Sequence, residues 1–308
     1  LVAANERFRD LLFEQNTYPF GKDGDHIPVR FFAEGDDEQQ LNSYVITNQW
    51  CYPKASCEGG KRLDVVMLVN GIPLIIGELK TPVRASVSWA DGAQDIQSYE
   101  QSIPQMFVPN VLNFASEGKT FRYASIGAPL TKWGPWFEDE DHSEGTLELA
   151  TKSFTDMLQP KRIVDIMRYF TLYATDRKFR KIKVICRYQQ YEGANAIVER
   201  VLNGYPRQGL IWHFQGSGKS LLMVFAAQKI RMQQALKSPT VVIVDDRIDL
   251  ETQITADFMS ADIPNLASAG SKDELIEFFE QDQRKILITT IFKFGDVTSK
   301  LSDRGNII

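Results

Sequence analysis

The chain has 308 residues, of which 43% are hydrophobic, and a formal net charge of −5. This length suits two domains of ordinary size, and the composition lets each of them bury a core. We expect a cytoplasmic protein, because no apolar run of about eighteen residues and no signal-peptide pattern is present. The three histidines are scattered and the three cysteines lack metal-ligand spacing, which argues against a zinc site.

Residues 62–80 predict a β-hairpin. Two apolar runs rich in Val, Leu and Ile flank Asn70-Gly71, a dipeptide that strongly favours a tight turn between strands. Asp64 lies in the first run, and Glu78 and Lys80 stand two residues apart at the end of the second. Because side chains alternate along a strand, Glu78 and Lys80 leave the same face of the sheet.

The register of this hairpin decides whether Asp64 joins that face. A two-residue turn at Asn70-Gly71 would place Asp64 opposite Gly77, on the other face. A three-residue loop or a bulge would instead set Asp64 against Glu78, with their Cβ atoms roughly 5 Å apart. We therefore predict the longer loop or a bulge.

The two carboxylates and the lysine predict a metal-dependent nuclease centre. The carboxylate oxygens of Asp64 and Glu78 suit Mg²⁺, which polarises a phosphodiester and lowers the pKa of a bound water. Lys80 would stabilise the charge that develops on the phosphate. The alternative is an ordinary hairpin with one inward acid and an exposed Glu-x-Lys pair, and the hairpin by itself leaves both interpretations open.

Nine basic residues crowd the segment 161–187, which holds only two acidic ones. The segment is either a phosphate-contacting surface between two domains or a solvated helix face. The basic residues are Lys161, Arg162, Arg168, Arg177, Lys178, Arg180, Lys181, Lys183 and Arg187.

A glycine-rich run predicts a phosphate-binding loop. Gly216-Ser217-Gly218-Lys219-Ser220 follows the strand-like residues 209–212 and precedes a helical pattern. Strand, glycine loop and helix are the context in which backbone N–H groups close around phosphates. Lys219 would reach the β- and γ-phosphates, and the Ser220 hydroxyl would ligate Mg²⁺. His213 stands where the usual pattern has its first glycine.

Two further apolar runs predict buried strands of the same domain. Residues 240–246 end in Asp245-Asp246, and residues 285–290 end in Thr289-Thr290. Asp246-Arg247 fits the end of the second strand of a RecA-like domain better than a pair of Walker B carboxylates. Each run alone is only a buried strand, but their order after the glycine loop supports a nucleotide-binding domain.

In this order the motifs resemble those of the restriction (R) subunit of type I restriction-modification enzymes. The run Arg187 to Tyr191 resembles the family's adenine-reading motif, which makes Gln190 the candidate for contacting the base. The similarity extends over nearly the whole chain, and the ordered combination of motifs is specific. The matching residues are Asp64, Val69 to Leu74, Glu78 to Lys80, Trp212-His213, Gly216 to Ser220, Asp246-Arg247 and Thr289-Thr290.

The resemblance implies an α/β protein with two domains. Residues 1–160 are expected to form a PD-(D/E)xK endonuclease domain, which is a mixed sheet flanked by helices. Residues 161–308 are expected to form the first RecA-like domain, a P-loop domain with a parallel sheet, of a superfamily 2 helicase or translocase motor that is truncated here.

The resemblance also implies an activity, partners and roles for residues. The expected function is ATP-dependent translocation of double-stranded DNA coupled to Mg²⁺-dependent endonucleolytic cleavage. Methylation and specificity subunits would be partners, and S-adenosylmethionine would enter only through them. The catalytic residues would be Asp64, Glu78, Lys80 and Tyr99; the ATP-binding residues Gln190, Gly216, Ser217, Gly218, Lys219 and Ser220; and the metal ligands Asp64, Glu78 and Ser220.

The sequence departs from the family pattern in two places. The family carries a Gln-x-x-x-Tyr element on the helix after the lysine, and here Asp95 stands where Gln is expected before Tyr99. Either Gln94 substitutes through a local shift, or Asp95 alters how the site meets DNA. No Asp-Glu-x-His box follows Thr290, so we expect the ATPase to be incomplete in this chain.

Two other interpretations remain open. A different nuclease–helicase fusion, such as a type III restriction subunit or a repair nuclease, would contain similar motifs, although the nuclease-first order favours type I. A non-catalytic scaffold that binds nucleotide and grips DNA would keep both folds without the chemistry.

Overall fold

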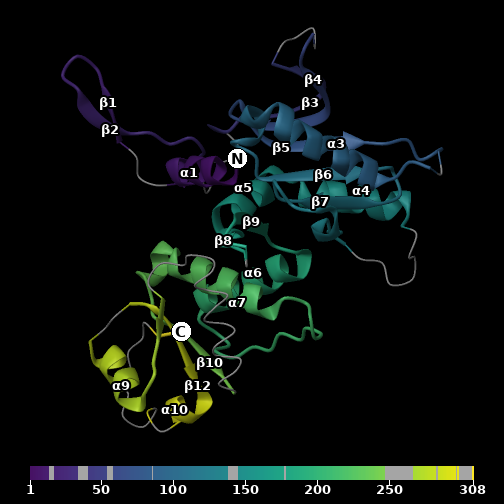
Figure 1. The fold of residues 1–308 in the computed structure, drawn as a ribbon. Helices are drawn as coiled ribbons and strands as arrows, with labels where there is room; N and C mark the ends of the chain where they lie inside the picture. Colours follow the sequence, from purple (N-terminus) through teal and green to yellow (C-terminus); the bar gives the residue numbers. More distant parts are fainter. Residues whose placement is uncertain are drawn as a thin grey trace. The chain divides into compact units, whose positions relative to one another are not determined.

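The chain forms two compact units by its internal packing (Figure 1), one of Leu1–Tyr173 with Arg180–Arg187 and one of Ala174–Phe179 with Tyr188–Ile308. The domain boundary at residue 160 stays a prediction, and our expectation for Arg247 lies outside the described residues. No helix among the described residues is both long enough and apolar enough to cross a bilayer. The structure is a computed structural model that describes residues 1–13, 17–33, 41–53, 58–84, 86–137, 145–176, 178–246, 266–281, 284–295, 297 and 307–308.

A five-stranded mixed sheet forms the centre of the first unit, as expected of a mixed α/β fold. Its strand order is β3-β4-β5-β6-β7; β5 and β6 run parallel, and the other neighbours run antiparallel. Strands β5 and β6 are buried along most of their length, because elements cover both faces of the sheet there. The strands are β3 (Tyr44–Tyr52), β4 (Lys61–Val69), β5 (Ile72–Leu79), β6 (Leu112–Ser116) and β7 (Phe121–Ala124).

The hairpin of β4 and β5 combines a two-residue turn with a bulge. Asn70 and Gly71 both have positive φ, 52° and 79°, which is the conformation that Asn-Gly adopts in tight hairpin turns. The turn pairs Val69 with Ile72, but the register shifts by one residue between Met67 and Leu68. The predicted bulge is therefore confirmed, and the three-residue loop offered beside it is wrong.

Helices and short hairpins complete the first unit. They are α1 (Val2–Phe13), α3 (Trp89–Ser102), α4 (Leu147–Met157) and α5 (Pro160–Tyr169), the 3₁₀ turns η2 (Pro104–Phe107) and η3 (Leu130–Lys132), and the strand pair β1 (Thr17–Phe20) with β2 (Asp25–Pro28). Strand β9 (Lys181–Ile185) pairs with β8 (Thr171–Thr175), whose last two residues are assigned to the second unit.

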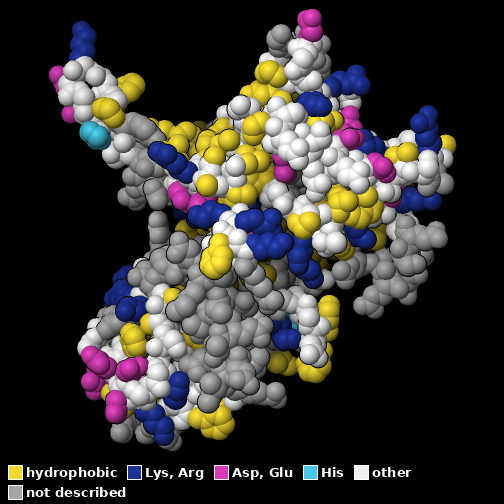
Figure 2. Space-filling view, viewed as in Figure 1, with side chains coloured by type: hydrophobic (Ala, Val, Ile, Leu, Met, Phe, Trp, Pro, Cys, Tyr) yellow, Lys and Arg dark blue, Asp and Glu magenta, His cyan; other side chains and the backbone are white. Residues whose placement is uncertain are grey.

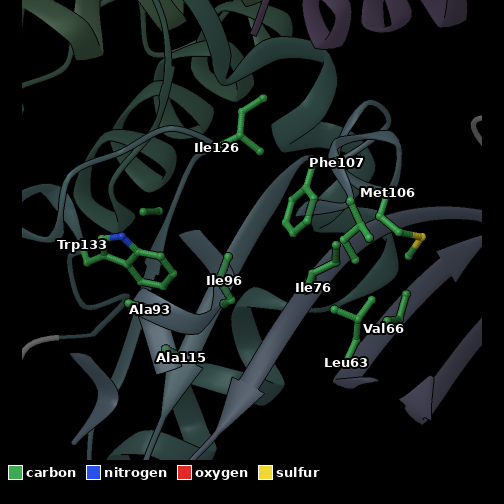
Figure 3. Packing of buried hydrophobic residues seen from close by; sticks show 12 residues of the cluster. Leu63, Val66, Ile76, Ala93, Ile96, Met106, Phe107, Ala115, Ile126 and Trp133 are labelled. Atoms are coloured by element: carbon green, nitrogen blue, oxygen red, sulfur yellow. The ribbon is translucent and has the colours of Figure 1, made fainter. Parts of the chain in front are cut away.

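Helix α3 begins at a capping box that the sequence provides. The Ser88 Oγ accepts a hydrogen bond from Ala90 N at 3.2 Å, and the Asp91 carboxylate accepts one from Ser88 N at 2.7 Å. These bonds satisfy amides that the first helical turn leaves without partners. The buried face of α3, which includes Ala93 and Ile96, packs on β5 and β6 and joins the apolar cluster of Figure 3.

Gly77 is required by packing on one face of β5. A Cβ atom at this position would lie 2.1 Å from Cζ of Phe114, whose side chain is fully buried. The Phe114 ring stacks on Phe121 and meets Phe154 of α4 edge-on, with ring centroids 5.5 and 5.4 Å apart. The missing side chain at position 77 therefore lets an aromatic group close against the sheet one residue before Glu78.

The second unit contains a three-stranded parallel sheet in the order β10-β12-β11. Strands β10 (Val241–Asp245) and β12 (Ile286–Thr290) confirm two predicted strands. Helices α6 and α7 pack against each other. The remaining elements are α6 (Tyr188–Asn203), α7 (Lys219–Arg231), η4 (Gln234–Leu236), β11 (Leu266–Ser268), α9 (Lys272–Glu280) and α10 (Ile291–Gly295).

The predicted strand at residues 209–212 is wrong. The structure has no strand there, and the side chains of Leu210 and Trp212 are 85% and 89% exposed. An apolar run becomes a strand only when a neighbouring strand supplies its backbone partners. None of the described strands pairs with this run.

Candidate functional site

Asp64 and Glu78 lie side by side on β4 and β5. Beyond the bulge, Val66 pairs with Ile76 and Val65 with Gly77. The same register places Asp64 opposite Glu78. The Asp64 backbone amide lies 3.4 Å from Glu78 Oε1. The structure thus brings together the two carboxylates that the sequence singled out.

Helix α3 lies directly over Glu78. The glycine at position 92 permits this approach, because a Cβ atom there would already lie 3.3 Å from Glu78 Cβ and 3.3 Å from Ala115 Cβ. Glu78 is consequently only 2% exposed. Burial, followed by the charge of Asp64, raises the pKa of Glu78 to about 7, against the opposing effect of Lys80. A nearby cation would therefore strongly favour the ionised form of this carboxylate.

Lys80 joins the carboxylates through two ion pairs. Its Nζ lies 2.5 Å from Asp95 Oδ2 and 3.5 Å from Glu78 Oε2. Burial opposes the charged form, but the contacts with Asp95 and Glu78 outweigh it and raise the pKa of Lys80. Asp95, which replaces the expected glutamine, thus reaches the site itself, whereas Gln94 beside it is exposed.

Tyr99, one turn after Asp95 on α3, lies near the Glu78 carboxylate. Burial, then the negative charge of Glu78, raises the pKa of the Tyr99 hydroxyl, and a hydrogen bond to Glu78 contributes to the shift. Lys61 lies over the Tyr99 ring, with Nζ 5.7 Å from its centroid. Tyr99 therefore stays protonated and donates to Glu78 at neutral pH.

Gln49 on β3 is a site residue that the sequence analysis missed. Its Nε2 donates a hydrogen bond to Asp64 Oδ1 at 2.8 Å, while Leu79 N donates to Asp64 Oδ2 at 3.0 Å. No motif marks this glutamine, because it reaches the site only through the pairing of β3 with β4. Both oxygens of Asp64 are thereby held in place.

The donor set fits a hard divalent cation that keeps part of its hydration shell. Asp64 and Glu78 offer carboxylate oxygens, and Mg²⁺ is commonly held by one or two carboxylates with water and phosphate oxygens. Within the described residues no group of three or more His, Cys, Asp and Glu side chains is arranged to hold an ion. The two carboxylates alone would thus supply the side-chain ligands.

Three residues of the basic segment are engaged inside the first unit. Lys183 is buried and donates from Nζ to the Asn110 carbonyl at 2.6 Å. Burial lowers its pKa well below the ordinary value. Arg162 pairs with Asp156, and Lys181 pairs with Glu6. These side chains stabilise the fold, which limits the share of the segment that could face phosphates.

The glycine-rich run forms a tight loop before α7. Gly216 and Gly218 have φ of 86° and 83°, and Lys219 is the first residue of the helix. The Lys219 Nζ donates to the carbonyls of His213 and Phe214, at 3.4 and 3.1 Å, so its ammonium folds back over the loop. The buried Ser217 Oγ finds no hydrogen-bond partner among the described residues.

Gln190 connects this loop to α6. Its side chain is 2% exposed, and Nε2 donates to the Gly218 carbonyl at 3.0 Å. Ser220 lies in the first turn of α7, next to Lys219. The structure therefore brings together all six residues expected to bind the nucleotide, with Gln190 bonded to the backbone of the loop.

Two protein families match separate parts of the chain. Residues 1–131 match the family described as type I restriction enzyme R protein N terminus, and residues 189–308 match the SWI2/SNF2 ATPase family. The HindI endonuclease subunit of Haemophilus influenzae, a type I restriction enzyme, is 32% identical over 327 aligned positions that span 100% of this chain and 31% of that protein. The chain belongs to the type I restriction endonuclease subunits.

Other endonuclease subunits of this family give the same alignment pattern. The SsaAORF53P subunit of Staphylococcus saprophyticus is 27% identical over 274 positions, covering 84% of this chain and 28% of the relative. The SauCOLORF180P subunit of Staphylococcus aureus is 27% identical over 284 positions, covering 88% and 29%. The chain thus spans less than a third of the length of these endonuclease subunits.

Proposed function

We propose that this chain joins an Mg²⁺-dependent DNA-cleaving domain of the PD-(D/E)xK type, residues 1–160, to the first RecA-like domain of an ATP-dependent double-stranded-DNA translocase, residues 161–308. The observation that carries the proposal is the cluster of Asp64, Glu78 and Lys80 on one face of the mixed sheet, with Glu78 buried beneath α3. A buried carboxylate beside a second acid is costly unless a cation or proton compensates it.

In the cleavage step each residue of the cluster has a separate task. Asp64 and Glu78 would hold Mg²⁺, which supplies Lewis-acid stabilisation of the phosphodiester. The Lys80 ammonium would neutralise charge that builds on the phosphate during attack by water. Tyr99, which donates to Glu78, would keep that carboxylate oriented toward the ion.

In the nucleotide site the loop supplies backbone donors and the helix supplies side chains. The amides of Gly216 to Gly218 would surround the phosphates, and Lys219 would leave its two carbonyl partners for the β- and γ-phosphates. The Ser220 hydroxyl would ligate Mg²⁺. Gln190 would hold the loop and contact the adenine.

The complete enzyme would use this nucleotide site to move duplex DNA. Methylation and specificity subunits would supply sequence recognition, with S-adenosylmethionine bound by them. Lys and Arg side chains gather around the position of β9 in the view of Figure 2, so a chain with net charge −5 still offers basic surface for DNA phosphates.

Plasmid cleavage by the reconstituted complex, with ATP and Mg²⁺, tests the nuclease assignment. Asp64→Ala and Lys80→Ala are each expected to slow cleavage by roughly 10²-fold or more, because each removes a group that stabilises the transition state. Lys119→Ala, an exposed lysine on the same unit, is the matched control and should cut at the normal rate. Normal cleavage by Asp64→Ala would refute the assignment.

ATP-dependent translocation by the reconstituted complex tests the proposed nucleotide site. Lys219→Ala is expected to abolish ATP-dependent translocation by the complex, as measured by displacement of a triplex-forming strand from the DNA. Lys237→Ala, an exposed lysine of the same unit, should translocate normally. Translocation by Lys219→Ala at the normal rate would exclude this loop as the motor's nucleotide site.

A further inference from the structure

Gln49 occupies an unusual backbone conformation directly opposite Asp64. The flanking pairs, Asn48 with Val65 and Trp50 with Leu63, set the register on both sides of it. Between these pairs the backbone of Gln49 turns to a φ of +52°. This is the left-handed region, which glutamine rarely adopts and which interrupts regular strand pairing.

Nothing in the local sequence requires this conformation. Left-handed residues in proteins are usually Gly, Asn or Asp at turns, and Gln49 is in the middle of a nine-residue strand. Such outliers persist when surrounding contacts hold them, and they cluster at functional sites. The contact made here is the hydrogen bond from Gln49 Nε2 to Asp64 Oδ1, at 2.8 Å.

That hydrogen bond completes the fixation of the Asp64 carboxylate. Leu79 N holds Oδ2 from the β5 side, and Gln49 holds Oδ1 from the β3 side. A carboxylate only accepts hydrogen bonds, so the amide of Gln49 must present its NH₂ group to Asp64. Each oxygen retains lone-pair capacity for an ion or for water.

We propose that Gln49 is a positioning residue that orients the Asp64 carboxylate for a divalent cation. The proposal rests on the ion site proposed for Asp64 and Glu78. Partners that orient a metal ligand affect metal affinity or activity by roughly 10- to 100-fold when they are removed. Gln49 therefore sets the cation affinity of the site from a strand that carries no recognised motif.

Substitution by glycine separates this role from a structural one. Gln49→Gly tolerates positive φ and removes the amide, so the variant should unfold at the same temperature as the wild type or higher. Its dissociation constant for Mn²⁺, measured by titration calorimetry on the whole chain, should rise at least about tenfold. Asn at position 49 tolerates the same backbone, but its side chain is one methylene shorter. The Mn²⁺ dissociation constant of Gln49→Asn should therefore lie between those of the wild type and Gln49→Gly.

Asn48→Gly is the matched control, because Asn48 is an exposed neighbour on the same strand. It should bind Mn²⁺ as the wild type does. Wild-type Mn²⁺ affinity in Gln49→Gly would overturn the positioning role while leaving the ion site intact. If the wild type and Asp64→Ala bind Mn²⁺ equally, the ion site itself is refuted, and the role of Gln49 with it.

Discussion

Gly92 on α3 and Glu78 on β5 are in such close contact that no larger residue fits at position 92 without movement. A Cβ atom there would lie 3.3 Å from Glu78 Cβ and 3.4 Å from the Glu78 carbonyl oxygen. Helix α3 therefore covers the Glu78 carboxylate and shields it from solvent. The raised pKa of Glu78 follows from this contact, because burial is its largest cause.

Replacing Gly92 with valine should lift α3 from the sheet. We expect the free energy of unfolding to fall by about 1–3 kcal/mol, as is usual for overpacking, and cleavage to slow because Tyr99 and Asp95 move with the helix. Urea denaturation and plasmid cleavage measure the two effects. Gly134→Val is the control, since a Cβ atom at position 134 meets nothing within 4 Å. An equal loss of stability in both variants would contradict the prediction.

Asp95 partly neutralises the positive charge of Lys80, whose proposed role is to stabilise charge on a phosphate. Asp95→Gln should therefore raise the cleavage rate about threefold, which corresponds to a partly exposed ion pair of roughly 0.6 kcal/mol. The gain should shrink as NaCl is raised from low to high concentration, because salt screens the same interaction. Gln94→Glu, at the exposed neighbouring position, should lack this gain. A slower Asp95→Gln enzyme would mean that Asp95 assists catalysis.

Glu100 should make stability fall as pH rises. Burial raises its pKa to about 7, against the effects of Gly127 N, Lys183 and Asn113. Between the ordinary pKa of 4.5 and about 7 the folded state keeps a proton that the unfolded state has lost, so stability decreases through this window. The decrease attributable to Glu100 is on the order of 3 kcal/mol.

Urea denaturation at pH 5 and pH 8 (about those values) measures this change. Glu100→Gln should show a smaller loss between the two pH values than the wild type, whatever its absolute stability. Glu78 titrates in the same direction, so Glu78→Gln should also flatten the profile and the double variant should flatten it further. An unchanged slope in Glu100→Gln would contradict the assignment.

Gln190 should matter for nucleotide affinity through the loop backbone. In Gln190→Glu a carboxylate oxygen would face the Gly218 carbonyl oxygen, and the hydrogen bond would be lost because both atoms are acceptors. The added negative charge would also repel the phosphates of a bound nucleotide. We expect ADP affinity to drop about tenfold, or about 1.4 kcal/mol. Gln189→Glu adds the same charge on the neighbouring residue and should change affinity much less. Equal losses would indicate a general charge effect.

The placement of Asp64, Glu78 and Lys80 in the first unit was predictable because it depends on local rules. Alternation along β5 puts Glu78 and Lys80 on one face, and the requirement that Asp64 join them predicts a bulge that the structure contains. The phosphate-loop residues likewise adjoin a helix start, as their glycines indicate. Whether these residues act as proposed stays a prediction.

The rest of the site depends on contacts between segments distant in sequence. Gln49 reaches Asp64 only because β3 pairs with β4, and Asp95 reaches Lys80 only because α3 packs across the sheet. Neither contact has a periodicity or spacing to reveal it. The strand predicted at residues 209–212 failed for the same reason, since strand formation depends on a partner that an apolar pattern does not specify.

The bulge between the turn and Glu78 also constrains the gene. Gain of one codon in the segment 72–77, with the turn and the bulge kept, would set Asp64 opposite Gly77 and turn Glu78 and Lys80 to the opposite face, although every site residue would still be encoded. A substitution scan would overlook this sensitivity, because it keeps the length constant. The facing of Asp64 and Glu78 therefore depends on the length of the hairpin and its bulge together, and not only on the identity of the two acids.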